Sequence, residues 1–271
     1  PDPSPAASDV YKRLRMPYTP DQIREIGEMH EEWLERESAL TRRLFAHPYG
    51  SARAREMMQH GLSRRLADLR HGVDRIFEAL PPDVEDPGQR DLRDATAFLQ
   101  AFVINVFGAV DNIAWIWASE IDPRDARGRP LRRGQIGFTP DHALLRASVS
   151  ERTRAYLEAT DAWFGYLEDY RHALAHRIPL YIPPKTFDDA DAAEFRRLEE
   201  ELMARGWTPE RWIEVQAAQR RLGTFDPVMM HSYEEQARPV RFHAQIVCDF
   251  ATVVEIAEHV VTDLETRAVD R

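Results

Sequence analysis

Residues 98–118 form the most apolar stretch of the chain, and this stretch constrains the fold more than any other feature. Four polar residues interrupt it: Gln100, Asn105, Asp111 and Asn112. A membrane span does not carry that many polar groups without a strong reason. We therefore predict that residues 89–121 form one long helix, apolar on nearly all sides of its second half and placed in the middle of a helical bundle.

Apolar residues at spacings of three and four predict further helices along the chain. These helices span residues 19–46, 51–80, 148–176, 188–205, 209–222 and 240–267, and residues 178–184 are extended. No strand pattern longer than a few residues and no internal repeat appears. The prediction is an all-α fold in which a flexible tail, 1–18, precedes one helical domain, 19–271. Its bundle core spans about 52–182, with a helical extension at about 187–267, and the first and last helices pack around that core.

Composition limits the partners and the compartment. The formal net charge of −10 argues against a broad nucleic-acid-binding surface but permits a small basic cleft. The one dense basic loop contains Arg124, Arg127, Arg129, Arg132 and Arg133. A single cysteine excludes an intrachain disulfide, and no secretory signal is evident at the N-terminus. We expect a cytoplasmic protein with no membrane partner.

Residues 170–177, at the end of the predicted helix 148–176, carry the most informative polar side chains. They read Tyr-Arg-His-Ala-Leu-Ala-His-Arg and place two arginines and two histidines within two turns. The guanidinium of arginine binds phosphate through a planar fork. Histidine transfers protons near neutral pH. Together such side chains can hold a phosphodiester and assist attack by a ribose hydroxyl without a metal ion.

Arg171 and His176, separated by four residues, match an R-x4-H motif. The stretch 170–183 resembles a bacterial group within the HEPN superfamily (higher eukaryotes and prokaryotes nucleotide-binding domains). In that family the motif lies near one end of a long helix in a four-helix bundle. His172 occupies the place of the polar residue that usually follows the arginine. By helix order the resemblance extends over roughly residues 52–182, and it implies a HEPN-like four-helix core.

The resemblance implies a metal-independent endoribonuclease that acts as a homodimer, with two copies of the motif facing each other. Its products would carry 2′,3′-cyclic phosphate and 5′-hydroxyl ends, and no cofactor would be required. Arg171 would bind and orient the phosphate, His176 would transfer a proton, and His172 would support the pair. Many HEPN proteins are binding or partner domains instead. The alternative is therefore a non-catalytic domain that binds nucleotide, RNA or a protein.

Helix geometry bears on how such a site would be completed. Positions five apart on a continuous helix differ by about 140° in direction, so Arg171 and His176 would not point the same way. This favours a site completed by a second chain. Tyr170 and Arg177 flank the pair as supporting residues. Asp111 and Asn112 interrupt the central helix, where Asp111 would orient a motif histidine, neutralise Arg171, or serve a buried structural ion pair.

Two further sets of side chains leave other readings open. Glu168, His172 and His176 share one helical face and, with a carboxylate such as Asp111, would form a zinc or iron site inside a bundle. His231 and His243 flank the last helix. They would line the same cleft as residues 170–177, or simply fix the loop and cap the helix.

Overall fold

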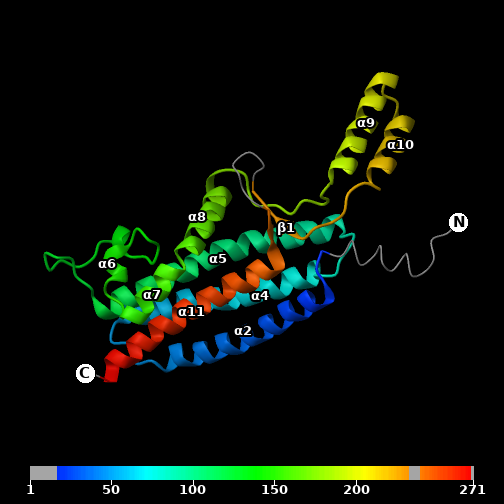
Figure 1. The fold of residues 1–271 in the computed structure, drawn as a ribbon. Helices are drawn as coiled ribbons and strands as arrows, with labels where there is room; N and C mark the ends of the chain where they lie inside the picture. Colours follow the sequence, from blue (N-terminus) through cyan, green and yellow to red (C-terminus); the bar gives the residue numbers. More distant parts are fainter. Residues whose placement is uncertain (1–16, 232–238, 270–271) are drawn as a thin grey trace.

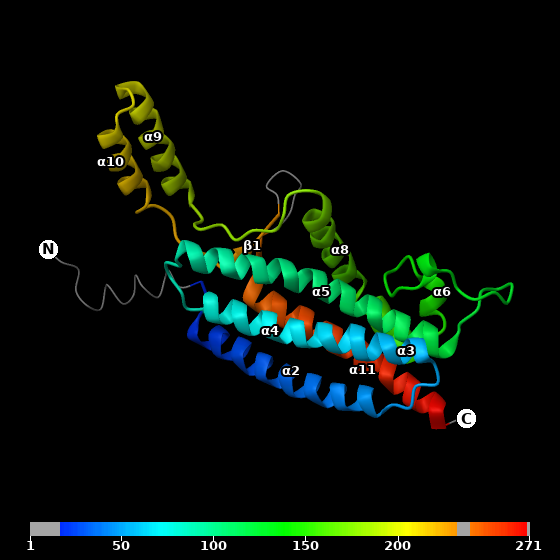
Figure 2. The ribbon, with the colours of Figure 1, turned by 180° about the vertical axis from the view of Figure 1, so that it is seen from behind.

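The protein is all-α: helices make up 71% of the computed structural model, and among the residues that it describes the one sheet has two strands. The structure describes residues 17–231 and 239–269, without the His176 side chain. Four long helices lie side by side along most of the molecule, while a helical hairpin projects from one end (Figure 1). Figure 2 shows the same arrangement from behind. The predicted fold class is therefore confirmed.

The elements follow the predicted helices closely. In chain order they are α2 (Pro20–Ala46), α3 (Ala52–Glu56), the π-helical segment η1 (Met57–Leu62), α4 (Ser63–Ala79), α5 (Gln89–Ile121), the 3-10 turn η2 (Arg133–Gln135), α6 (Ala143–Arg146), α7 (Glu151–Ala159), α8 (Asp161–His176), α9 (Asp189–Arg205), α10 (Pro209–Gln219), β1 (Val228–Met229), β2 (Val240–Arg241) and α11 (Phe242–Val269). The strands β1 and β2 pair antiparallel, with Val228 opposite Arg241.

Helix α5 is the central helix of the bundle. Side chains along its length are buried, among them Leu99, Phe102, Val106, Ile113 and Trp117. It packs against α4, α11 and α8. Within the described residues it is the one helix long and apolar enough to cross a membrane. In this structure it serves as the core helix of the bundle, as its polar interruptions predict.

Helix α11 packs against α2, α4 and α5 and completes the four-helix bundle. The last helix therefore packs against helices that lie within residues 52–182 as well as against the first helix. The reason is the composition of α11, in which Val253, Val254, Ile256 and Ala257 are all buried. Buried apolar side chains extend along α11 from Ile246 to Leu264, and they must be covered by more than one neighbouring helix.

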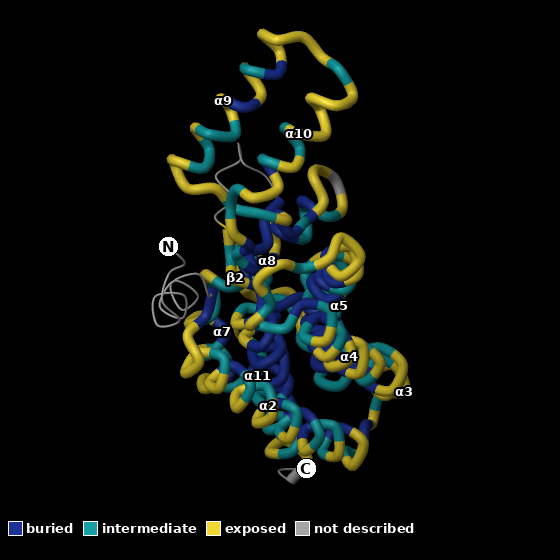
Figure 3. Tube along the Cα trace, turned by 90° about the vertical axis from the view of Figure 1, so that its right-hand side faces the viewer, coloured by how far each residue is buried: buried dark blue, intermediate teal, exposed yellow. Residues whose placement is uncertain are grey.

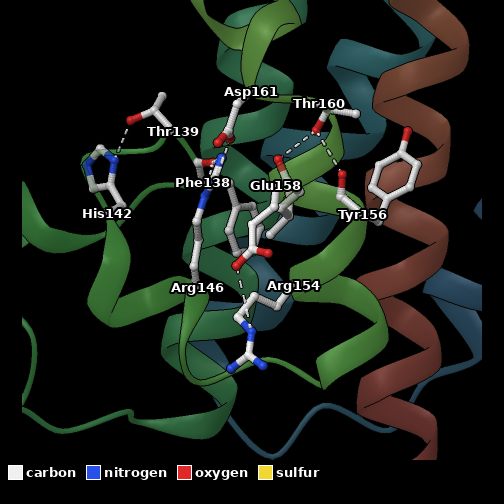
Figure 4. Close-up of polar contacts among 10 residues, drawn as sticks. Phe138, Thr139, His142, Arg146, Arg154, Tyr156, Glu158, Thr160 and Asp161 are labelled. Atoms are coloured by element: carbon white, nitrogen blue, oxygen red, sulfur yellow. Dashed lines mark hydrogen bonds and ion pairs between the residues drawn. The ribbon is translucent and has the colours of Figure 1, made fainter.

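The predicted helix 148–176 is two helices, α7 and α8, that meet at Thr160 (Figure 4). The Thr160 hydroxyl donates to the backbone carbonyls of Tyr156 and Leu157, at 3.2 and 3.0 Å. Such a side-chain bond competes with the helical ladder and bends the chain. Arg146 of α6 holds Asp161, the first residue of α8, at 2.6 Å. Helix α8 consequently leaves the bundle at its own angle and lies across α5 (Figure 1).

Helices α9 and α10 form a hairpin that extends away from the bundle (Figures 1 and 2). Its surface is largely exposed in Figure 3. Two short antiparallel bridges, Thr186 with Thr224 and Tyr181 with Met230, join the two chain segments at its base. The predicted tail 1–18 falls outside the described residues except for Pro17 and Tyr18. Those two are buried.

Helix α2 begins at a complete capping box. The Thr19 hydroxyl accepts a hydrogen bond from the Gln22 amide at 3.2 Å, and the Gln22 side chain accepts one from the Thr19 amide at 2.9 Å. We expect Thr19→Ala to lower the free energy of unfolding by about 1 kcal/mol, because two amides at the helix start lose their partners. Urea denaturation measures this difference. Thr266→Ala, near the end of α11, should have little effect, and an equal loss in both variants would contradict the role of the cap.

Candidate functional site

Arg171 anchors a polar face where α8 crosses α5. Its guanidinium carbon lies 4.2 Å from the centroid of the Phe107 ring, close enough for a cation–π interaction. The side chain is half-buried, so one side of the guanidinium plane rests on the ring while solvent still reaches the group. Phe107 and Asp111 are four residues apart on α5 and therefore share one helical face. The aromatic ring thus fixes Arg171 beside Asp111.

Asp111 is the acidic member of this face. It lies on a solvent-accessible side of α5, not in the core as a buried structural acid would. Desolvation by the surrounding protein raises the pKa of its carboxyl, and the positive charges of Arg171, His142 and Arg65 partly oppose that rise. Arg171 is therefore one of three positive groups whose charge acts on the Asp111 carboxyl. A carboxyl with a raised pKa is better suited to proton transfer than an ordinary aspartate.

Arg65 of α4 lies on the neighbouring side of α5, where two asparagines bind it, and its charge acts on Asp111. Its Nη1 donates to Asn105 Oδ1 at 2.8 Å, and its Nε donates to Asn112 Oδ1 at 3.1 Å. The guanidinium lies on Gly108, where a Cβ atom would come within 2.3 Å of the Arg65 Cζ. Gly108 lies between Asn105 and Asn112, which are seven residues apart. Because it has no side chain, it leaves room for the flat guanidinium of Arg65.

The π-helical segment η1 lies opposite Asn112. A Cβ atom on Gly61, within η1, would come within 2.8 Å of the Asn112 Nδ2. The same Asn112 nitrogen donates to the Met57 sulfur at 3.7 Å. Single π-helical turns recur at functional sites in proteins. Here the turn lets α4 and α5 approach closely on either side of the Arg65 network.

His142 completes the face from the loop before α6. Thr139 Oγ1 and His142 Nδ1 are 2.7 Å apart, which holds the imidazole in place (Figure 4). Two guanidiniums against one carboxylate leave this face with a formal charge of +1, or +2 when His142 is protonated. On a chain with a net charge of −10, such a local excess is a basis for binding an anion.

The residues predicted as catalytic lie at the end of α8. The His172 Nε2 is 3.6 Å from Glu168 Oε1, and both side chains are about half exposed. His176 is the last residue of α8, and its side chain lies outside the described part of the chain. No group of three His, Cys, Asp or Glu among the described residues could hold a metal ion. Of the three α8 residues predicted to bind a metal, the structure therefore describes the side chains of Glu168 and His172 but not that of His176.

The structure separates the other predicted residues from this face. Tyr170 is buried, and its hydroxyl donates to the Met229 carbonyl at 3.4 Å. Its ring meets the buried His231 edge-on at 5.0 Å. Arg177 is exposed and follows α8. Tyr170 and His231 therefore anchor α8 to β1 rather than line a shared cleft with Arg171.

His243 was expected to line a cleft or cap the last helix, and the structure places it in the core. It is fully buried, and its Nε2 lies 2.6 Å from the Leu80 carbonyl oxygen. Burial lowers its pKa to about 4, so the ring is neutral at physiological pH. The rings of Tyr18, Phe77 and Phe242 surround it. A neutral core histidine cannot serve the α5–α8 face.

Sequence patterns missed Arg65, Asn105, His142 and Phe107 as members of this face. One signal was present: Asn105 and Asn112 are seven residues apart, so both lie on the same side of α5 with Gly108 between them. That spacing marks a polar stripe on an apolar helix that requires a partner. It did not reveal that Arg65, forty residues earlier, is that partner.

Two of the five arginines in the basic loop before α6 form ion pairs with aspartates of the same segment. Arg124 pairs with Asp122 at 2.6 Å, and Arg129 pairs with Asp125 at 2.8 Å. Backbone amides of Arg127 and Arg129 also donate to Asp125, which lowers the pKa of its carboxyl together with the Arg129 guanidinium. Arg124 and Arg129 are therefore engaged in contacts within the loop.

Comparisons with known proteins supply no relative: no family model matches the chain, and neither the curated proteins nor the solved structures give a significant match.

Proposed function

We propose that the α5–α8 face binds the phosphodiester backbone of RNA and cleaves it without a metal ion. The observation that carries this proposal is the Arg171 guanidinium, fixed 4.2 Å above Phe107 yet accessible to solvent, next to a carboxyl whose pKa is raised. A fixed guanidinium binds phosphate with less loss of side-chain freedom than a mobile one. The resemblance of residues 170–183 to HEPN ribonucleases points to the same chemistry.

The cleavage needs one base and one acid besides the phosphate anchor. The ribose 2′-oxygen forms a bond to phosphorus while the bond from phosphorus to the 5′-oxygen breaks. The base takes the 2′-hydroxyl proton, and the acid protonates the departing 5′-oxygen. The products are a 2′,3′-cyclic phosphate and a 5′-hydroxyl, with no redox change. In this proposal Arg171 stabilises the phosphorane charge, and His176, supported by His172, transfers a proton.

Two copies of the chain complete the site in this proposal. Arg171 and His176 diverge on α8 by about 140°, so the pair is brought together across two α8 helices more readily than within one. Arg65 and His142 extend the positive face on which the strand would lie. With one cysteine in the sequence, we place this activity in the reducing cytoplasm.

The test is an RNase assay on structured and unstructured RNAs in the presence of EDTA. We expect the wild type to cleave and to leave cyclic phosphate ends. Arg171→Ala should lower kcat/KM at least about 100-fold, because the phosphate loses its charged anchor. Arg171→Lys should retain part of the activity, because it keeps the charge but not the planar fork.

Arg24→Ala on α2 is the matched control, because Arg24 is exposed in a different part of the bundle and its loss leaves the face unchanged. It should cleave like the wild type. Equal cleavage by wild type and Arg171→Ala would reveal a contaminating nuclease and sink the proposal. Binding of RNA without cleavage, abolished in Arg171→Ala, would instead establish the non-catalytic binding domain.

A further inference from the structure

One side of α8 carries three aromatic residues whose polar atoms connect the helix to its neighbours. Trp163, Tyr166 and Tyr170 follow one another at spacings of three and four, so they share one side of the helix. The Trp163 Nε1 donates to the Asp249 carboxyl of α11 at 2.8 Å, and the Tyr170 hydroxyl donates to the Met229 carbonyl at 3.4 Å. The Tyr166 hydroxyl is buried and has no hydrogen-bond partner among the described residues. The contact of α8 with α11 therefore depends on Asp249.

Asp249 is a fully buried acid, and only one of its two oxygens is hydrogen-bonded. Its Oδ1 accepts from Trp163 and from the Gln245 Nε2, the latter at 2.7 Å. Its Oδ2 has no partner in the described part of the chain. An ionised carboxylate is unfavourable here, because neither water nor a donor stabilises the charge on that oxygen. A protonated carboxyl is neutral, and it carries a proton that can be donated.

The side chains that face Asp249 supply no charge that would balance its ionised form. From α8 and α11 these are Trp163, Tyr166, Tyr170, Gln245 and Cys248. Burial and the charge of Asp249 raise the pKa of both tyrosines and of the cysteine, which keeps all three neutral. Among the described residues, no arginine, lysine or histidine charge acts on this carboxyl. Ionisation therefore places one uncompensated negative charge between α8 and α11.

Helix α8 is a separate segment that can change its position while the bundle stays folded. The break at Thr160 disconnects its helical hydrogen bonds from those of α7, and α8 lies across α5 (Figure 1). Arg171 belongs to α8, whereas the Phe107 ring beneath its guanidinium, 4.2 Å away, belongs to α5. A displacement of α8 from α11 consequently moves Arg171 relative to Phe107.

We propose that Asp249 is a pH-sensitive clamp on α8. The protonated carboxyl keeps α8 docked on α11, and the ionised carboxylate favours an open position of α8 in which water reaches Asp249. On opening, the O–H bond of the carboxyl breaks and its proton passes to solvent. Because α8 carries Arg171, the geometry of the α5–α8 face then depends on pH. The consequence for RNA cleavage rests on the proposed function, whereas the release of α8 does not.

The clamp closes on acidification. Burial raises the pKa of Asp249 from 3.8 to about 7 while α8 is docked, and water access in the open position returns it toward its ordinary value. Between these two values the equilibrium constant for opening rises about tenfold per pH unit, and above about pH 7 it levels off. We therefore expect a rise of roughly 20-fold between about pH 5.5 and about pH 7.5.

Hydrogen–deuterium exchange of the full chain, followed by mass spectrometry over this pH range, measures the opening of α8. After correction for the intrinsic pH dependence of amide exchange, the opening constant of α8 in the wild type should rise by the expected factor. Asp249→Asn keeps the acceptor at Oδ1 but cannot ionise, so its α8 should stay protected at every pH. Asp169→Asn, on the exposed side of the same helix, is the matched control and should behave like the wild type.

The clamp is overturned if the protection of α8 in the wild type does not change with pH, or if it changes equally in Asp249→Asn. A parallel loss of protection in α4 would show that ionisation destabilises the whole fold instead of releasing α8, which also overturns it. Release of α8 in a protein that cleaves no RNA would support the clamp and count against the proposed function alone.

Discussion

Asp249→Asn is expected to stabilise the protein by up to about 4 kcal/mol at pH 8. Asp249 is completely buried between α8 and α11. Its Oδ1 accepts hydrogen bonds from Trp163 Nε1 at 2.8 Å and Gln245 Nε2 at 2.7 Å. Its Oδ2 has no partner in the described structure, nor has the buried Tyr166 hydroxyl. Asparagine keeps the shape and an acceptor at Oδ1 but removes the buried charge.

The pKa of the Asp249 carboxyl determines whether the substitution raises or lowers stability. Burial raises it from 3.8 to about 7, only partly offset by the two hydrogen bonds. The folded state therefore holds this proton more tightly than the unfolded state does. Stability contributed by the protonated form is fully present below about pH 4 and is lost as pH rises to about 7, where the loss levels off. A shift of about three pH units corresponds to roughly 4 kcal/mol.

Urea denaturation of wild type and variant from about pH 4 to pH 8 measures this difference. The two curves should nearly coincide at the acidic end and diverge steadily toward neutral pH. Asp169→Asn on the exposed face of α8 is the matched control, and it should stay within about 0.5 kcal/mol of wild type at every pH. A constant offset between wild type and Asp249→Asn at all pH values would mean that Asp249 is not protonated in the fold.

Arg146→Ala is expected to lower the free energy of unfolding by about 3 kcal/mol. Arg146 is buried, and both its Nε and Nη2 donate to the Phe138 carbonyl, at 2.8 and 2.6 Å (Figure 4). Alanine leaves that carbonyl without its partner and opens a cavity beside Phe164, over whose ring the guanidinium lies at 5.3 Å. The ion pair with Asp161 adds less, because Asp161 is 44% exposed.

Arg154→Ala is the control for this loss. Arg154 lies on α7 near Arg146 in the same region (Figure 4), and its pair with Glu158 spans 3.8 Å with both side chains exposed. Its removal should change stability by less than about 0.5 kcal/mol. Thermal or urea unfolding compares the two variants. Equal losses would contradict the view that Arg146 holds the loop of α6 against the start of α8.

The Arg146 contact also matters for the proposed site. It fixes Asp161, the first residue of α8, while Tyr170 anchors the far part of that helix to β1. Arg171 sits next to Tyr170, so the position of its guanidinium over Phe107 depends on both anchors. We therefore expect Arg146→Ala to reduce RNA cleavage as well, with Arg154→Ala unaffected in the same assay.

Local patterns in the sequence were sufficient to predict most of the helices and the place of α5, but not the break at Thr160. The Thr19 capping box, the apolar spacing along α5 and the prolines after α4 act within a few residues, so they can be read without a structure. The R-x4-H motif likewise placed Arg171 near the end of a helix. The role predicted for Asp111 stays a prediction, although the positive charge of Arg171 acts on its carboxyl. The HEPN relationship itself remains a prediction.

Only the tertiary structure decided which distant residues meet. Arg65 binds Asn105 across forty residues, and Asp249 reaches Trp163 across eighty-six. The break at Thr160 depends on Arg146 holding Asp161, a contact that helical periodicity does not encode. Helix α11 joined the bundle because its apolar surface needed covering by partners that lie more than a hundred residues away. Periodicity determines which face of a helix is apolar, but the choice of what covers that face is made by packing among all the helices at once.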